Sequence, residues 1–267
     1  MKKFMIRCDM EGVSGIVSYE QAEPGASSYD EGRRLFMEDL LALIRGLQSG
    51  GADEIHIFDE HYYGRNICLE QLPEGVITYH GKPLITPDWA GGLDNSFAGM
   101  ILLGFHSKRG TYDALLNHTY EPDIADLKIN GLSVGEIGME TAMAGSVGVP
   151  LVMLTADSEG IREAKELVPE VVGVSVKESL GEYSAVCYPT VTTSRMIEAA
   201  AKAVAEQASY HAPLCLDGDV TLEVTFFDTP FAKLYEKIYG LAPICGKRVL
   251  DCWAEYQKRK VTVAALL

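Results

Sequence analysis

The sequence has few basic residues and lacks the long apolar runs that mark membrane proteins. Lysine and arginine number 23 against 38 aspartate and glutamate residues, which gives a formal net charge of −15 at pH 7. Such a charge repels phosphate backbones and anionic lipid surfaces, so we expect neither nucleic acid nor a membrane as a partner. The longest uninterrupted apolar stretch, residues 97–105, is far shorter than the roughly 18 residues that a membrane span requires.

Paired cysteines and a usable signal sequence are also missing. The six cysteines include no C-x-x-C pair, and a chain of 267 residues is too long to depend on a disulfide framework. The basic start of the chain is similar to that of a signal peptide, but Arg7, Asp9 and Glu11 interrupt the apolar segment that should follow. We therefore expect free thiols and a cytoplasmic protein.

What is present is the composition of a folded globular protein, with 47% hydrophobic and 23% charged residues. Up to about residue 167, short apolar runs alternate with amphipathic segments. The pattern predicts strands at 4–8, 54–58, 76–79, 100–105 and 149–155, and helices at 29–49, 136–147 and 158–167. This alternation indicates an α/β fold with a mainly parallel sheet flanked by helices.

The order of elements changes after residue 180. Before that point, Asn130-Gly131 within an alternating segment predicts a β-hairpin that leads into the helix at 136. The later sequence predicts a helix at 193–208, a strand at 220–227, a short helix at 231–239 and a strand near 247–252. We expect an α/β domain over residues 1–180 and a smaller α+β unit over residues 181–267 packed on it.

Residues suited to metal binding follow several of the predicted strands. Open parallel sheets bind ligands beyond the carboxyl ends of their strands. Those positions hold Asp9, Glu11, His61 and His106, and Glu136 follows directly after the predicted hairpin. Carboxylate oxygen and imidazole nitrogen suit zinc or a similar divalent metal. With Asp9 bridging, these side chains could hold two ions about 3.5 to 4 Å apart.

Each of these residues also has a structural interpretation. An Asp-x-Glu after a strand can cap a turn or a helix, and a single histidine often lies on the surface or in the core. Their joint placement at successive strand ends favours the metal site. On a predicted loop, His118 could transfer a proton to a leaving amine, could stabilise a developing oxyanion or could be a solvent-exposed residue. Similarly, Asp59 could orient a ligating histidine or serve as a turn residue.

Several motifs around these residues occur in a fixed order. They are Cys8–Gly15, Asp59–His61, Leu103–His106, Asn130–Gly131, Val134–Gly138, Val149–Val152 and Asp157. Together they resemble the zinc-dependent D-aminopeptidase family, whose type member comes from a dipeptide-transport operon. The resemblance implies two zinc ions per subunit, with Mn²⁺ or Co²⁺ as possible substitutes, held by Asp9 as the shared ligand and by Glu11, His61, His106 and Glu136.

The same resemblance implies an activity and an assembly. It assigns His118 as the catalytic histidine in the hydrolysis of short peptides from the free N-terminus, including D-amino-acid peptides such as D-Ala-D-Ala. It also implies a homo-oligomer, in the type case a decamer ring that encloses the active sites.

Two other functions stay open at this point. A phosphoesterase or amidase can use the same pair of metals, and Lys108 and Arg109 beside His106 could neutralise a phosphate, although the sequence contains no G-x-x-x-x-G-K-[ST] loop. A metal-stabilised protein that binds peptides without cleaving them is the non-catalytic alternative.

Overall fold

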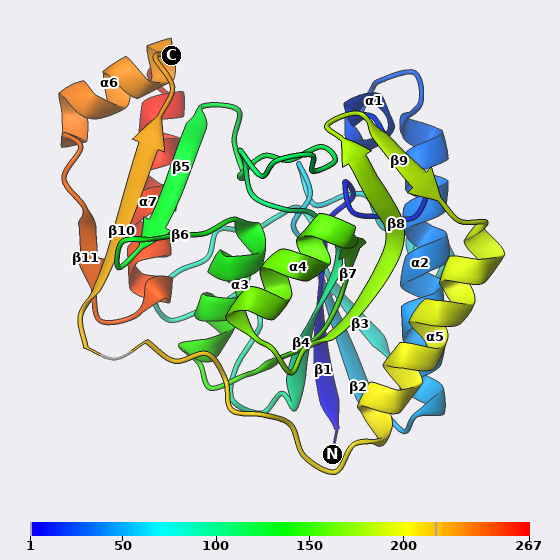
Figure 1. The fold of residues 1–267 in the computed structure, drawn as a ribbon. Helices are drawn as coiled ribbons and strands as arrows, with labels where there is room; N and C mark the ends of the chain where they lie inside the picture. Colours follow the sequence, from blue (N-terminus) through cyan, green and yellow to red (C-terminus); the bar gives the residue numbers. More distant parts are fainter. Residues whose placement is uncertain (1, 217) are drawn as a thin grey trace.

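The computed structural model describes residues 2–216 and 218–267 and contains a large and a small sheet (Figure 1). The large sheet has the strand order β3-β2-β1-β4-β7-β8-β9. Its strands are β1 (Lys3–Cys8), β2 (Glu54–Asp59), β3 (Val76–Tyr79), β4 (Gly99–Phe105), β7 (Leu151–Asp157), β8 (Val172–Gly181) and β9 (Ser184–Cys187). All neighbours are parallel except β8 and β9, so the predicted mainly parallel sheet is confirmed.

Helices cover both faces of this sheet (Figure 1). One face carries α1 (Tyr19–Ala22), α2 (Tyr29–Ser49) and α5 (Thr190–Glu206), and the other carries α3 (Glu136–Gly145) and α4 (Ser158–Leu167). Side chains alternate along β1 as expected for a strand. Phe4 and Ile6 pack in the core with α2 and α5, whereas Met5 packs in the core with α3.

The small sheet is antiparallel, with the order β11-β10-β5-β6. Its elements are β5 (Ile124–Ile129), β6 (Leu132–Ser133), β10 (Val220–Phe226) and β11 (Ile244–Gly246), with α6 (Pro230–Tyr239) and α7 (Val249–Ala264) packed beside it. The predicted hairpin is confirmed, because Asn130 (φ 49°) and Gly131 (φ 80°) form its left-handed turn between β5 and β6. This sheet therefore draws on both sides of residue 180, and the domain boundary placed there stays a prediction.

The predicted strand near 247–252 is wrong, because this segment begins helix α7. The backbone and side chain of Arg248 donate to the Asp251 carboxylate and close the first helical turn. The buried residues Val249, Trp253 and Tyr256 then follow the spacing of a helix face. The sequence analysis also assigns no element to α1, β8, β9 or the 3-10 helix η1 (Leu69–Gln71).

The structure also describes the cysteines and the apolarity of the helices. All six cysteines are free. Within residues 2–216 and 218–267, no helix combines the length and apolarity needed to cross a membrane.

Candidate metal centre

The chain crosses over the end of β4 directly after β1, which brings the first two acidic residues to the carboxyl edge of the sheet. The Asp9 backbone N–H donates to the Leu103 carbonyl at 2.8 Å. At Gly12 the approach is so close that a Cβ atom would lie 1.7 Å from the Phe105 carbonyl oxygen. Only glycine fits this crossing, and it sets Asp9 and Glu11 beside the end of β4.

The structure gathers all five predicted ligands in two groups that share Asp9. The groups are Asp9, Glu11 and His61, and Asp9, His106 and Glu136, and the ligand-type atoms within each lie within 4.8 Å of one another. His61 Nδ1 lies 2.8 Å from Asp9 Oδ1, and His106 Nε2 lies 3.3 Å from Asp9 Oδ2. All five side chains are buried. Their arrangement matches the predicted bridge, and their roles as ligands stay a prediction.

Backbone carbonyls fix the orientation of both imidazole rings. His61 Nε2 donates to the Ala22 carbonyl at 2.7 Å, and His106 Nδ1 donates to the Ser107 carbonyl at 2.9 Å. The second nitrogen of each ring therefore faces the carboxylates. Because nitrogen and oxygen lone pairs repel, a proton or a metal cation must lie between them. Metal-binding histidines are commonly held by the outer nitrogen in this way.

The donor set fits a divalent cation. Asp9 Oδ2, Glu11 Oε2 and His106 Nε2 are buried and have no hydrogen-bond partner, whereas buried polar atoms are ordinarily paired. Burial alone would lower the pKa of His61, but Glu11 and Asp9 raise it well above its usual range. Burial also opposes the positive form of His106, and Glu136 and Asp9 again raise the pKa. The acidic groups thus create a potential that favours positive charge.

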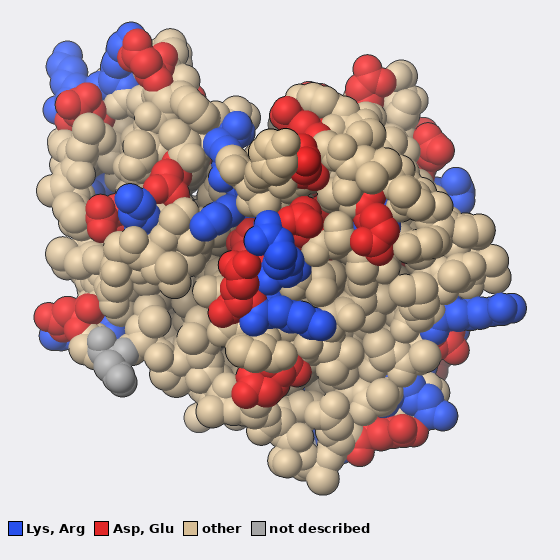
Figure 2. Space-filling view, in the orientation of Figure 1, with Lys and Arg blue, Asp and Glu red and all other residues tan. Residues whose placement is uncertain are grey.

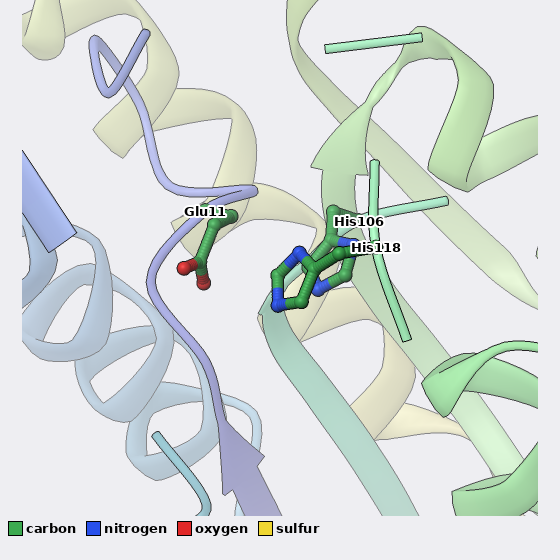
Figure 3. Close-up of side chains that lie close together, drawn as sticks. All are labelled: Glu11, His106 and His118. Carbon is green, nitrogen blue, oxygen red and sulfur yellow. The ribbon is translucent and has the colours of Figure 1, made fainter. Parts of the chain in front are cut away.

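His118 lies at the rim of this cluster, more exposed than the predicted ligands. Its ring stacks on His106 with centroids 4.1 Å apart, and Figure 3 shows both rings facing Glu11 across the opening. The Nδ1 atom donates to the Leu116 carbonyl at 3.0 Å, which directs Nε2 to within 3.7 Å of Glu136 Oε1. The His118 side chain keeps 19% of its surface exposed. It is therefore the histidine that a substrate can reach.

The loop that carries His118 is fixed from two sides. Near its base, the Arg109 backbone N–H donates to the Thr119 hydroxyl at 3.2 Å. Near its tip, Leu116 adopts a left-handed conformation (φ 47°), which is costly for a branched side chain. The Leu116 N–H donates to the Glu182 carbonyl in the β8–β9 turn at 2.9 Å. These contacts place His118 against His106.

Asp59 orders the His61 loop through its backbone. Its carboxylate accepts from the His61 N–H at 3.3 Å and from the Asn66 N–H at 2.7 Å. The Asn66 side chain in turn donates to the His61 carbonyl at 2.9 Å. Asp59 is thus a turn residue that positions His61 without a hydrogen bond to its ring.

Sequence reasoning missed Lys177, which holds the Glu11 loop. This lysine on β8 is fully buried, and its Nζ donates to the carbonyls of Glu11, Val13 and Ile16 at 2.6, 2.8 and 2.5 Å. Burial lowers the pKa of Lys177 to about 8, against the opposing charge of Asp157. The available signal was a lysine that directly follows the alternating Val172, Val174 and Val176 and breaks their alternation.

Sequence reasoning also missed a buried ionic network beneath the centre. Arg7 on β1 is 1% exposed and donates to Glu60 at 2.7 Å and to Glu140 at 2.5 Å. Glu140 also accepts from the Tyr120 hydroxyl at 3.0 Å, and the Tyr120 N–H donates to Glu136 at 2.7 Å. The signals were an arginine within an apolar strand and a second glutamate one helical turn after Glu136.

Comparisons with known proteins agree with this architecture. A D-aminopeptidase from Bacillus subtilis (strain 168) is 29% identical over 197 residues, which cover 73% of this chain and 70% of that protein. A solved structure described as the Zn-dependent D-aminopeptidase DppA from Bacillus subtilis, a self-compartmentalizing protease, shares the fold with a TM-score of 0.89 and 23% identity. That match covers 99% of this chain and 97% of the other.

The family-level comparison covers almost the entire chain. The sequence model of peptidase family M55, described as D-aminopeptidase, matches residues 1–260. This match includes both ligand groups and the loop of His118, and it confirms the resemblance seen in the ordered motifs. The chain belongs to the D-aminopeptidase family.

Proposed function

We propose that this protein is a zinc aminopeptidase with two ions per subunit that hydrolyses short peptides from the free N-terminus, including D-amino-acid peptides such as D-Ala-D-Ala. The observation that carries the proposal is the pair of buried ligand groups that share Asp9. Membership of the D-aminopeptidase family and the zinc named for the similar Bacillus structure support it. Mn²⁺ or Co²⁺ could occupy the same donors.

The residues of the chain divide between holding the ions and handling the proton. Asp9, Glu11, His61, His106 and Glu136 would hold the two ions. When bound, such a pair supplies Lewis acidity toward a peptide carbonyl and lowers the pKa of water at the centre. His118 presents Nε2 toward the same opening while Nδ1 is engaged with a backbone carbonyl. This geometry suits proton delivery to the departing amine.

We also propose that the chain assembles into a homodecamer ring that admits only short or unfolded peptides. The similar Bacillus structure is described as self-compartmentalizing, which supports this assembly. Light scattering coupled to gel filtration tests it, because a decamer is far larger than the 29.1 kDa chain. A particle with the mass of one chain would refute the ring.

Metal content and peptide hydrolysis, measured on the same preparation, test the activity. We expect about two ions per subunit and release of alanine from D-Ala-D-Ala or L-Ala-L-Ala that stops on chelation and returns with zinc. The variant Asp9→Asn should lose metal and turnover. Asp39→Asn is the matched control, because Asp39 is also buried, belongs to neither ligand group and accepts hydrogen bonds from Ser14.

The other outcomes separate the alternatives. If no metal binds after reconstitution, the proposed centre is wrong. Bound metal with phosphate release from a model phosphoester, and no peptide turnover, would favour a phosphoesterase. Tight binding of a dipeptide without turnover, with both ions present, would favour a peptide-binding protein.

A further inference from the structure

Arg109 is a half-buried cation without an acidic partner in a strongly acidic protein. The chain carries 15 more acidic than basic residues. Even so, within residues 2–216 and 218–267 no carboxylate oxygen lies within 4.0 Å of the Arg109 guanidinium. Its Nε atom is buried and has no hydrogen-bond partner. Burying such a group without compensation is unfavourable, so a ligand that supplies an anion would stabilise it.

The position of Arg109 ties it to the candidate centre. It lies on the loop between His106 and His118, and its backbone is bonded to Thr119. Its guanidinium packs over the ring of Phe227, 5.2 Å from the centroid, directly after β10 of the small sheet. Arg109 therefore lies where the lobe built on the large sheet meets the lobe built on the small sheet. Figure 2 shows the surface hollowed between these lobes.

Two tyrosine rings extend from His118 into the field of the Arg109 charge. The Tyr19 ring lies 5.8 Å from the His118 ring and 6.3 Å from the Tyr183 ring, edge-on in both cases. Burial raises the pKa of Tyr19 to about 12, while the positive charges of His106 and Arg109 act against it. The hydrogen bond to Glu182 raises the pKa of Tyr183, and the positive charge of Arg109 opposes this rise. The Arg109 charge thus acts on both rings, and the charge of His106 acts on Tyr19.

We propose that Arg109 binds the C-terminal carboxylate of a short peptide whose amino end is held at the metal centre. This inference rests on the proposed aminopeptidase function and adds how the substrate is chosen. The planar guanidinium matches a carboxylate with two parallel hydrogen bonds, and the Phe227 ring supports it from one side. A residue of extended chain spans about 3.5 Å, so a carboxylate anchor on the loop that joins His106 to His118 favours dipeptides and other very short peptides.

The test compares D-Ala-D-Ala or L-Ala-L-Ala, whichever the protein cleaves, with the corresponding C-terminal amide, using kcat and KM for each. We expect the wild type to prefer the free carboxylate by about 10- to 100-fold in kcat/KM. Arg109→Gln should lose this preference mainly through KM and cleave the amide at the wild-type rate. Arg109→Lys should keep part of the preference, because it retains the charge without the planar fork.

Arg65→Gln is the matched control. Arg65 is exposed, packs over the Tyr63 ring at 5.6 Å and has no carboxylate partner in the described part of the chain. Its variant should keep the wild-type preference.

Three results would overturn the assignment. If the wild type cleaves acid and amide equally well, the aminopeptidase stands and the carboxylate anchor is wrong. An equal loss on both substrates in Arg109→Gln would show that Arg109 only positions the His118 loop. If neither peptide is cleaved while both metal ions are bound, the proposed function fails, and this inference fails with it.

Discussion

Both faces of the large sheet bury an apolar core, but they differ in the charge that β1 contributes to them. Toward α2 and α5, β1 presents Phe4, Ile6 and Cys8, which are fully buried in an apolar core. Toward α3, the same strand presents Arg7, which is buried with two glutamates. Apolar burial stabilises a fold by about 25 cal/mol per Å², whereas buried charges cost desolvation free energy that their attraction only partly returns.

The difference shows what each face contributes. The α2–α5 face, called the apolar face here because β1 presents no charged side chain to it, supplies stability through close packing. The α3 face, called the ionic face here, adds buried charge to an apolar core of its own, and its network leads through Tyr120 to Glu136, one of the five candidate ligands. We conclude that the ionic face positions Glu136, as Lys177 positions Glu11, and that the packing of the apolar face between the sheet, α2 and α5 maintains the scaffold. The following predictions test this division, beginning with the largest expected effect.

Replacing Arg7 by Met should break the ionic face. The change leaves the buried carboxylates of Glu60 and Glu140 without their cation, so the free energy of unfolding should fall by about 3–5 kcal/mol. Metal affinity should also fall by about 10- to 100-fold, because the network supports Glu136. Denaturant unfolding and metal titration measure the two effects. Adding Glu140→Gln to Arg7→Met should recover part of the stability, and a single variant as stable as the wild type would contradict the role of the network.

Asp39 tests the effect of a buried acidic group on the apolar face, because it is the acidic residue of α2 that is buried there. Burial raises the pKa of Asp39 to about 6, despite its bonds to Ser14. The folded state then holds a proton that the unfolded chain releases near pH 4. The bound proton stabilises the folded state fully below pH 4. This stabilisation is lost as the pH rises through 6, and the free energy of unfolding then falls by up to about 3 kcal/mol.

The measurement is the free energy of unfolding in chelator at pH values from 4 to 7, for the wild type and Asp39→Asn. The advantage of the wild type over the variant should shrink as the pH rises, because only the wild type has this titrating group. A difference that stays constant with pH would show that Asp39 does not titrate in this range.

His118→Ala separates binding of the metal from catalysis at the centre. We expect metal content near that of the wild type and turnover lower by about 10²-fold, which is the usual contribution of a general acid or base. His56→Ala is a control, because His56 on β2 is bonded to Tyr79 and Glu54 and takes no part in the two ligand groups. Loss of metal in His118→Ala would make His118 a ligand, and unchanged turnover would make it an ordinary loop residue.

The candidate ligands could be found from the sequence because local rules place them. Parallel strands end at one edge of a sheet, so residues directly after β1, β2 and β4 must converge, and Asp9, His61 and His106 lie close together in the structure. The hairpin before Glu136 could also be predicted from the sequence, because Asn130-Gly131 is a strong turn signal.

The supporting contacts could not be found in this way. Lys177 contacts the Glu11 loop across 166 positions of sequence, and Arg7 contacts Glu140 across 133. Local periodicity carries no information about such partners. The segment near 247–252 was misassigned for a related reason, since a short segment with several apolar residues fits a strand and a helix equally well. Its length, which extends to Ala264, identifies the helix.

Gly46→Ala should give the smallest effect and tests the apolar face alone. A Cβ at Gly46 on α2 would lie 2.4 Å from the Glu198 carbonyl oxygen and 2.6 Å from the Ala201 Cβ, both on α5. Separating the helices costs about 1–3 kcal/mol, and the better helix propensity of alanine returns up to about 1 kcal/mol. We therefore expect a net loss of about 1–2 kcal/mol in thermal or denaturant unfolding, with kcat per folded molecule unchanged. Ala201→Gly in the same chain should recover part of the loss, because it removes one of the two contacts. A fall in kcat at constant metal content would mean that the apolar face also positions the centre, and the division between the two faces would then not hold.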